Sequence, residues 1–485
     1  MNYLQVYEAP KNIPGREDYK VRVRQPEGEW HNLFIYEVKV DMHEVRSASM
    51  ACFDLEGVAE VEITCLYTEV ESVNIAPSSR NISFESRGRT IKFNLIGPQK
   101  LSIEINGDIF RNLHLFANPK EVDAPQPEDP NVLVLQPGIH RKPDLLRLLR
   151  NPVDGSSSET LKTLYFAPGT HYIEETVLPI PSDTTVYLAG GSALIGSLVC
   201  EGVRNVNIRG RGVIYLADFH RYSAFRGVRI AFSQSVKVEG ITVIDPPHYS
   251  IFIGQSEGIE IENFKSFSTR GWSDGIDIMS SSDVTIQDVF MRNSDDCIAI
   301  YGSRWDFYGD TRNISVSDSI LWADVAHPLM IGTHGDHKRN GDVIENIIFT
   351  NIDILNHHEP QENYWGALAI NAGDRNKVSN VLYDNIRVER IEQGQLIDVR
   401  VVYNQDYNPE PGTSIRNITF RDISYSGEAN PSRIYGFDEE RAVEDVTFIN
   451  LRVNGELINA PRAEHMAINP FAKNIVFVIE ETIVE

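Results

Sequence analysis

The chain has 485 residues and a formal net charge of −24. This charge argues against nucleic acid and anionic membranes as partners, because both require a basic surface. No apolar run approaches the roughly 18 residues that a membrane-spanning helix needs. Residues 1–20 also lack the basic and apolar regions of a secretory signal. We therefore expect a cytoplasmic protein that binds neither nucleic acid nor membrane, or a secreted one if a signal was trimmed off.

The first part of the chain consists of short alternating apolar runs. YKVRVRQ (19–25), LFIYEVKV (33–40) and KLSIEIN (100–106) are typical, and Gly, Pro, Asn or Ser separate such runs. Short strands at spacings of about 8 to 12 residues are typical of an antiparallel β-sandwich. We place this small domain at residues 1–118, followed by a linker, 119–131, that is rich in proline and acidic residues.

The rest of the chain, residues 132–485, repeats itself. Nine weakly similar segments recur at intervals of 23 to 37 residues, and each carries a polar residue, a β-branched residue, a variable residue and a second apolar residue. This pattern predicts an all-β domain, a right-handed parallel β-helix, in which a residue one period later lies about 4.8 Å from its predecessor. The first apolar residues of the nine segments are Val206, Val236, Ile259, Val284, Ile314, Ile347, Val381, Ile418 and Val446.

Two adjacent acids, Asp295 and Asp296, stand in the stretch NSDDCIAIY. The segment RGWSDGIDIMSS places Asp274 21 residues earlier, close to the shortest repeat interval, so the three carboxylates should stack on one exposed face. A solvated turn is the simpler interpretation, but repulsion within such a group costs free energy unless function uses it. Because neighbouring strand residues face opposite ways, the backbone must bend or bulge at this point if both acids are to reach one groove.

Three clustered carboxylates have more than one chemical use. Their mutual field keeps one of them protonated, which supplies the acid and the carboxylate that glycosidic hydrolysis needs, with inversion at a separation of roughly 6.5 to 9.5 Å. The same oxygens would instead bind calcium in a polysaccharide lyase that acidifies a uronate α-proton. A glycan-binding solenoid without catalysis is the third interpretation.

The sequence does not favour a metal or another cofactor. The four cysteines form no CxxC pair, which indicates neither a zinc site nor a disulfide framework. A histidine-rich set lacks HExxH or similar spacing, so we expect no metal and no cofactor. This set comprises His327, His334, Asp336, His337, His357 and His358.

At these residues the sequence resembles a known group of enzymes. SDGIDI and NSDDCIAI are similar to the motifs NTDG and DDC of polygalacturonases, and to TDG and NDD of dextranases and isopullulanase; AHPLMIG (326–332) is similar to the polygalacturonase segment GHGxxIG. The resemblance implies a right-handed parallel β-helix and hydrolysis of α-glycosidic bonds with inversion. It also implies that Asp295 is the general acid, that Asp274 and Asp296 position and deprotonate water, and that His327 hydrogen-bonds the acid or a sugar hydroxyl.

The resemblance is closer to the dextranases in domain layout. They carry an N-terminal β-sandwich, and LIDVRVVYNQDY is similar to a dextranase segment with an arginine at Arg400. The polygalacturonase element Arg-Ile-Lys is absent, because the matching stretch GALAIN has Leu368 and Ile370 at the basic positions. Since those basic residues hold a uronate carboxylate in that family, an acidic galacturonan is not the expected substrate.

Aromatic residues and long insertions gather near the carboxylates. Four of the five tryptophans lie between residues 272 and 365, and insertions in successive rungs would form the walls of one groove. We expect Trp322 to fill the core and Asp277 to be buried and hydrogen-bonded. The predicted substrate-binding residues are Trp272, Trp305, Tyr301, Arg304, His248, His334, Lys338, Trp365, Tyr364 and Arg400.

We therefore predict an inverting glycoside hydrolase whose partner is an α-linked glycan or oligosaccharide. Its expected catalytic residues are Asp295, Asp274, Asp296 and His327. The sequence leaves the sugar, the linkage, internal or end-wise attack and the oligomeric state open.

Overall fold

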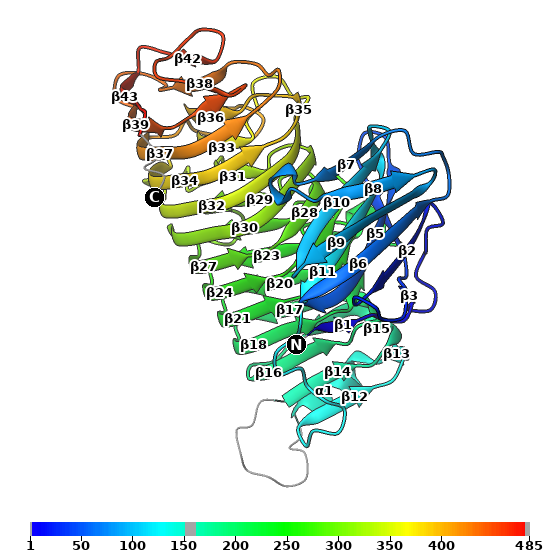
Figure 1. The fold of residues 1–485 in the computed structure, drawn as a ribbon. Helices are drawn as coiled ribbons and strands as arrows, with labels where there is room; N and C mark the ends of the chain where they lie inside the picture. The colour runs from blue at the N-terminus through cyan, green and yellow to red at the C-terminus, as the bar shows by residue number, and fades with distance from the viewer. Residues whose placement is uncertain (1, 151–161, 481–485) are drawn as a thin grey trace.

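The computed structural model describes residues 2–150 and 162–480 and contains three β-sheets (Figure 1). Two sheets of six and five strands form an N-terminal sandwich, and one 32-stranded sheet winds into a parallel β-helix. The predicted fold class is therefore confirmed. Within the described residues, no helix is long and apolar enough to cross a membrane.

The sandwich encloses its own apolar core, to which Val21, Phe53 and Ile103 belong. Its strand pairs are antiparallel as expected, except that β5 and β11 run parallel. The six-stranded sheet contains β1 (Tyr3–Gln5), β4 (Tyr36–Val40), β5 (Arg46–Glu56), β7 (Val73–Ala76), β10 (Gln99–Ile105) and β11 (Asp108–Pro119). The five-stranded sheet contains β2 (Tyr19–Arg24), β3 (His31–Asn32), β6 (Val58–Cys65), β8 (Phe84–Arg87) and β9 (Thr90–Ile96).

The β-helix has three columns of parallel strands, and the first column carries the sequence repeats. Along this column each strand pairs with the strand one rung later. Its members are β12 (Val132–Leu135), β14 (Lys162–Phe166), β16 (Thr184–Leu188), β18 (Arg204–Gly210), β21 (Gln234–Glu239), β24 (Glu257–Glu262), β27 (Ser282–Gln287), β30 (Thr311–Val325), β32 (Val343–His358), β34 (Lys377–Val388), β37 (Ser414–Tyr425), β39 (Val443–Ile449) and β43 (Ala472–Val478).

The other two columns position the sandwich and the candidate site. The second column contains β13 (Gly138–His140), β15 (Gly169–Pro179), β17 (Ser192–Glu201), β19 (Val213–Tyr215), β22 (Thr242–Ile244), β25 (Lys265–Phe267), β28 (Phe290–Ser294), β35 (Ile391–Gln393) and β40 (Arg452–Val453), which is joined by β41 (Glu456–Leu457). The third column contains β20 (Val228–Ala231), β23 (Ile251–Gly254), β26 (Ile276–Met279), β29 (Ile298–Tyr301), β31 (Leu329–Gly332), β33 (Leu368–Ala372), β36 (Ile397–Val401), β38 (Ser432–Tyr435) and β42 (Met466–Ile468).

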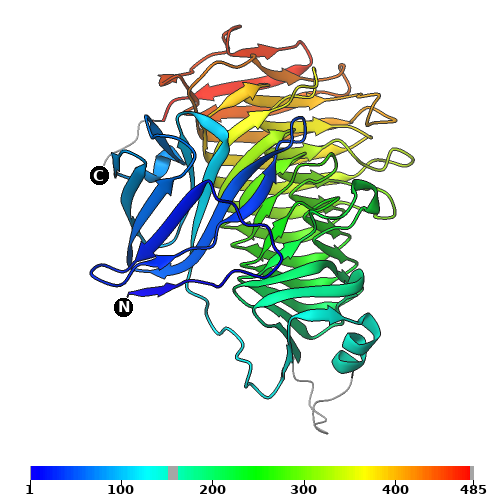
Figure 2. The same ribbon diagram turned by 90° about the vertical axis from the view of Figure 1, so that its right-hand side faces the viewer.

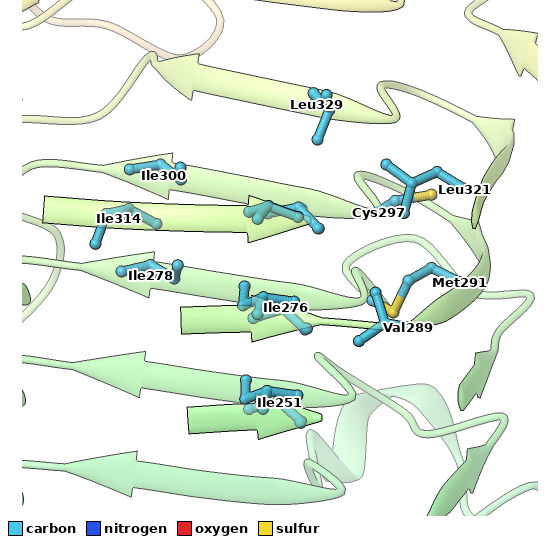
Figure 3. Packing of buried hydrophobic residues seen from close by; sticks show 14 of the residues in the cluster. Ile251, Ile276, Ile278, Val289, Met291, Cys297, Ile300, Ile314, Leu321 and Leu329 are labelled. Carbon is cyan, nitrogen blue, oxygen red and sulfur yellow. The ribbon is translucent and has the colours of Figure 1, made fainter. Parts of the chain in front are cut away.

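The predicted register of the repeats is confirmed at every step. Val206 pairs with Val236, and the pairing continues through each expected residue to Val446. The third column stacks in the same way, and Figure 3 shows Ile251, Ile276 and Leu329 one above another inside the helix. The interior is thus a continuous apolar stack that fixes which residues are neighbours in space.

The polar residue that opens each repeat has a backbone role. Asn313, Asn346, Asn380 and Asn417 each adopt a positive φ of 55 to 59° immediately before the first apolar residue. Asparagine tolerates this conformation better than most residues, and here its side chain also donates to the equivalent residue one rung earlier. A hydrogen-bonded ladder therefore marks the turn before the first column.

One helix, α1 (Lys142–Arg150), was not expected from the sequence. Its side chains Leu145 and Leu149 are buried against the first rungs. The end of a solenoid leaves apolar residues without a neighbouring rung, and a capping element solves this problem.

The sandwich packs along one side of the middle rungs (Figures 1 and 2). Val38, Met50 and Phe116 of the sandwich share an apolar cluster with Phe267 of β25 and with Trp322, which lies in the part of β30 that pairs with β28. Trp322 is fully buried as expected, but it fills this interface and not the interior of the β-helix.

A buried ion pair lies at the centre of this interface. The Arg292 guanidinium donates to both oxygens of Asp324 at 2.9 to 3.2 Å and to Asn112 of the sandwich at 2.9 Å. The backbone N–H of Asp41 donates to Asp324, and that of Met42 donates to Ser294, the residue before Asp295. The sandwich therefore contacts the segment that leads into the candidate site.

We expect Arg292→Met to lower the free energy of unfolding by about 3 to 5 kcal/mol, because it leaves the Asp324 carboxylate buried without its cation. Denaturant titration measures this change. Arg312→Met is the matched control, since it removes only the exposed pairs with Asp310 and Glu345 and should cost less than about 1 kcal/mol. Equal effects of the two substitutions would contradict a structural role for the buried pair.

Candidate active site

The candidate site is built on the turns that enter the third column. In successive rungs the N–H of Ser250 donates to the carbonyl of Asp274, that of Gly275 to Asp296, and that of Cys297 to His327, each at 2.8 Å. These bonds place Asp274, Asp296 and His327 one above another. Carboxylate oxygens of Asp274, Asp295 and Asp296 lie within 4.8 Å of one another, as the repeat interval predicted.

The turn bends sharply at Asp295. This residue has a φ of 120°, and β28 and β30 change register beside it, between Asn293 and Ser294. Trp272 and Ala326, in neighbouring rungs, also have positive φ, at 72° and 70°. Conformations of this kind cost free energy and gather at functional sites. The predicted bend is therefore present, and it allows the side chains of both Asp295 and Asp296 to lie close to that of Asp274.

Gly275 explains why a glycine follows the first aspartate. A Cβ atom at this position would lie 2.0 Å from Cε of Met291 and 2.3 Å from the carbonyl oxygen of Cys297. Only glycine leaves room for the next rung to pack closely enough to align Asp274 with Asp296.

Asp296 accepts hydrogen bonds from three donor groups. Its Oδ1 accepts the backbone N–H of His327 at 3.0 Å and Nδ1 of the same residue at 2.7 Å, and Oδ2 accepts the Tyr301 hydroxyl at 3.2 Å. Nε2 of His327 lies 2.8 Å from the carbonyl of Tyr364. Since both ring nitrogens face acceptors, His327 satisfies them as an imidazolium, and the Asp296 charge raises its pKa although burial opposes this.

The other two aspartates retain protons more strongly than free aspartate. Burial and the charge of Asp277 raise the pKa of Asp274 well above its usual range. Burial also raises the pKa of Asp295, and the charge of Asp296 adds to the effect. Asp295 is the member of the triad with partial solvent exposure, and its Oδ2 accepts the N–H of Trp272 at 2.8 Å. The group therefore offers both a protonated carboxyl and a fixed carboxylate.

Asp277 is fully buried as expected, and its side chain hydrogen-bonds with the neighbouring Asp274 carboxyl. Its cationic neighbour is Nη1 of Arg304 at 3.9 Å. Burial raises the pKa of Asp277 well above its usual range. A protonated Asp277 is the form that this environment favours.

Two recesses collect six of the predicted substrate-binding residues, although no member of the aspartate triad lines either of them. A recess of about 380 Å³ is lined by Arg304, Trp305, His334 and Lys338. A second one, of about 470 Å³, is lined by Tyr364 and Arg400. Most of the lining residues of both recesses belong to the long loops that the sequence analysis predicted between successive strands.

Trp272 and His248 lie next to each other, and His248 is also close to Trp305 of the first recess. The Trp272 side chain is 47 % exposed, and its ring centre lies 6.3 Å from that of His248, which is buried. Both residues therefore remain candidates for the groove.

Three predicted binding residues have other contacts. Tyr301 is buried, and its hydroxyl donates to Asp296. Trp365 lines neither recess, and the Arg433 guanidinium lies 5.4 Å from its ring centre. The charge of Arg400 is already paired with Asp398 at 2.7 Å.

The stretch aligned with Arg-Ile-Lys has a different register from the one expected. Leu368 and Ile370 point into the β-helix core, so the outward positions on β33 are Ala369 and Asn371. Strand residues alternate between faces, and a shift of one residue exchanges them. Neither Ala369 nor Asn371 is basic, so the arginine and lysine of the Arg-Ile-Lys element are absent in this register as well.

Glu359 is a neighbour that sequence reasoning missed. It is buried, its Oε1 accepts the N–H of Gln361 at 2.6 Å, and its charge contributes to the raised pKa of His327. Burial raises the pKa of Glu359 to about 7. The residue lies in an insertion, where no repeat indicates its position.

The histidine-rich set does not form a metal site. Across residues 2–150 and 162–480, the grouping whose ligand atoms come close enough to hold an ion is the aspartate triad. Its all-oxygen donor set suits a hard cation such as Ca²⁺.

Comparisons with known proteins find similar sequences. A profile of the family "Glycosyl hydrolases family 28" matches residues 200–467. A probable endopolygalacturonase D of Emericella nidulans is 27 % identical over 38 % of this chain and 32 % of the relative. A dextranase of Arthrobacter globiformis is 22 % identical over 60 % of this chain and 44 % of the relative. The chain thus spans less than half the length of these relatives.

Solved structures share the fold. Dex49A from Penicillium minioluteum aligns with a TM-score of 0.63 over 98 % of this chain and 96 % of its own, at 14 % identity. The polygalacturonase from Erwinia carotovora aligns with a TM-score of 0.51 over 75 % of this chain and 99 % of its own, at 16 % identity. The predicted resemblance to both groups is confirmed, and the first alignment also includes the sandwich.

We expect His327→Gln to move the alkaline limb of kcat/KM to higher pH as well as to lower kcat. The imidazolium lowers the pKa of Asp295, so its removal lets Asp295 keep an acidic proton to a higher pH. Glycan turnover from pH 4 to 9 measures the limb. His465→Gln, at the far end of the β-helix, should leave the profile unchanged; a limb that stays in place or moves to lower pH in His327→Gln contradicts the coupling.

Proposed function

The chain belongs to glycosyl hydrolases family 28, and from this premise we propose that it hydrolyses α-glycosidic bonds of a poly- or oligosaccharide with inversion at the anomeric carbon. The observation that carries the proposal is the aspartate triad, in which a partly exposed carboxyl with a raised pKa lies beside a fixed carboxylate. Glycosidic hydrolysis needs these two forms together. The names of the relatives, polygalacturonase and dextranase, support a glycan substrate.

The environments of the three aspartates suggest their roles. Asp295, the accessible acid, would protonate the leaving oxygen. Asp296 would accept the proton of the attacking water, and the His327 imidazolium would stabilise its charge before the step. Asp274, whose pKa is well above its usual range, would position the water and share the proton with Asp296.

Inversion is supported by the hydrogen bonds of Asp296, although the nearest oxygens are closer than the expected 6.5 to 9.5 Å. Both oxygens of Asp296 accept protons from Tyr301 or His327. A carboxylate with its lone pairs engaged in this way is a poor nucleophile but still orients a water molecule.

We expect Asp295→Asn to lower kcat by several orders of magnitude, because the amide cannot protonate a leaving group. New reducing ends from a panel of α-glycans measure the loss, and circular dichroism checks folding. Asp283→Asn is the matched control, since asparagine already occupies the equivalent positions 313, 346 and 380 of the turn ladder. A folded Asp295→Asn protein with near-normal turnover would falsify the assignment of the acid. If the unsubstituted protein binds glycans but does not hydrolyse them, the protein is a glycan-binding solenoid without catalysis.

A calcium-dependent lyase is the second candidate, because the triad oxygens are spaced closely enough to hold a cation. We expect NMR of early products to show the inverted anomer, no product absorbing in the near ultraviolet, and the same rate with and without EDTA. A retained anomer would refute inversion. Loss of activity with EDTA together with an absorbing, unsaturated product would establish the lyase instead.

A further inference from the structure

The bend that carries Asp295 is built on a β-bulge between β28 and β30. The two strands change register between Asn293 and Ser294, so that Asp324 is the extra residue of β30. A bulge bends its strand and changes the direction of the side chains beside it. The direction of the Asp295 carboxyl therefore depends on the geometry of this bulge.

A hairpin loop of the sandwich contacts both strands of the bulge. The loop, residues 41–45, joins β4 to β5, and it begins with Asp41 and Met42. The backbone N–H of Asp41 donates to the Asp324 carboxylate at 3.1 Å, and that of Met42 donates to Oγ of Ser294 at 3.0 Å. One hydrogen bond thus goes to the extra residue of β30, and the other goes to the residue that precedes Asp295.

The side chain of Asp41 holds the loop in this conformation. Asp41 is buried and has a φ of 62°. Its Oδ1 accepts the N–H of His43 at 2.9 Å, and its Oδ2 lies 3.3 Å from Nη2 of Arg46. Aspartate and asparagine tolerate a positive φ and close turns through such a side-chain acceptor. Asp41 therefore directs the two successive N–H groups toward the bulge.

Buried serines connect the loop to two members of the triad. Ser294 is fully buried and lies directly before Asp295, and its carbonyl accepts a hydrogen bond from the Ser273 hydroxyl at 3.3 Å. Ser273, which is also fully buried, lies directly before Asp274. The residues that precede both acids are thus linked to each other, and Oγ of Ser294 links them to the sandwich.

We propose that Asp41 and Met42 are positioning residues for the reaction, because the sandwich loop fixes the bulge that holds the Asp295 carboxyl beside the other two aspartates. This inference rests on the proposed function, in which Asp295 protonates the leaving oxygen. A general acid must lie within hydrogen-bond reach of that oxygen, and a displacement of about 1 Å can cost on the order of 100-fold in rate. The sandwich therefore acts on turnover through Asp295.

Two substitutions of Asp41 test the proposal. Asp41→Ala removes the side-chain acceptor at a positive φ, so we expect kcat to fall about 10- to 100-fold while KM changes less than about 3-fold. Asp41→Asn keeps an acceptor for the His43 N–H and tolerates the same φ, and it should retain kcat within about 3-fold. Initial rates of reducing-end release from an α-glycan that the unsubstituted protein cleaves give both constants.

The pH profile distinguishes positioning of the acid from a general loss of stability. Burial and, after it, the charge of Asp296 raise the pKa of Asp295, and both effects weaken if the carboxyl moves away. We therefore expect Asp41→Ala to shift the alkaline limb of kcat/KM to lower pH, opposite to the shift expected for His327→Gln. The carboxyl and imidazole groups that interact with the charge of Asp295 include Asp274, Asp277, Asp296, His327 and Glu359.

Asn106→Ala is the matched control. Asn106 has a φ of 55° in another turn of the sandwich, and its Oδ1 accepts the N–H groups of Glu71 and Ser72 at 2.8 and 3.0 Å. Its loss should lower stability in denaturant titration as Asp41→Ala does, but it should leave kcat and the pH profile unchanged. Ser294→Ala removes the acceptor of the Met42 N–H from the β-helix side. It should reproduce the effects of Asp41→Ala, which covers the case in which Asp41→Ala does not fold.

Equal losses of kcat in Asp41→Ala and Asn106→Ala would overturn the positioning role, and so would a folded Asp41→Ala protein with kcat within 3-fold of normal. If Asp295→Asn is inactive in the same assay, the proposed function stands and only the role of the loop is lost. Near-normal turnover in Asp295→Asn would instead refute the proposed function, and with it the reason for positioning this carboxyl.

Discussion

The stacking of one rung on the next is the constraint on which the rest of the molecule depends. Backbone hydrogen bonds such as Gly275 N–H to the Asp296 carbonyl hold successive turns together whatever charges their side chains carry. Repulsion between Asp274 and Asp296 is therefore opposed by the whole column of apolar strands below and above them. The fold supplies the free energy that keeps an unfavourable group of carboxylates in one place, and the group in turn has unusual protonation behaviour.

Basic and acidic residues occupy separate stretches along the candidate site. Along the turns that enter the third column, Arg226 comes first, then the aspartate triad, and then His327, whose raised pKa also reflects the charge of Glu359. A bound anionic sugar would be attracted to the first region and repelled by the second. Such an alternation favours one direction and one register of a bound chain, because a shift by one sugar would bring like charges together. The buried pair of His327 and Asp296 is neutral as a unit and does not disturb this order.

The fold was predictable wherever spatial neighbours followed from sequence spacing. The spacing of the apolar residues from Val206 to Val446 predicted the strand register of the first column. The interval between Asp274 and Asp295 predicted that the three aspartates lie together. Both predictions depend only on the period of the repeat. Side chains outside the period were harder to place. Leu368 and Ile370 were assigned to the wrong face because a one-residue shift leaves the apolar pattern almost unchanged. Glu359 and the helix α1 lie in segments without a repeat, so the period gave no indication of their positions.

The interface between the sandwich and the β-helix has a consequence for how the chain is made. The sandwich leaves the ribosome first, yet its outer apolar residues Val38, Met50 and Phe116 are covered only by strands that come much later. Asp41 and Asp324, which meet across this interface, are 283 residues apart. At about 5 to 20 residues per second the wait lasts roughly 15 to 60 s. During synthesis the nascent sandwich therefore exposes this apolar surface to solvent. A chaperone that covers it would bind the sandwich before the β-helix strands with the aspartate triad have been synthesised.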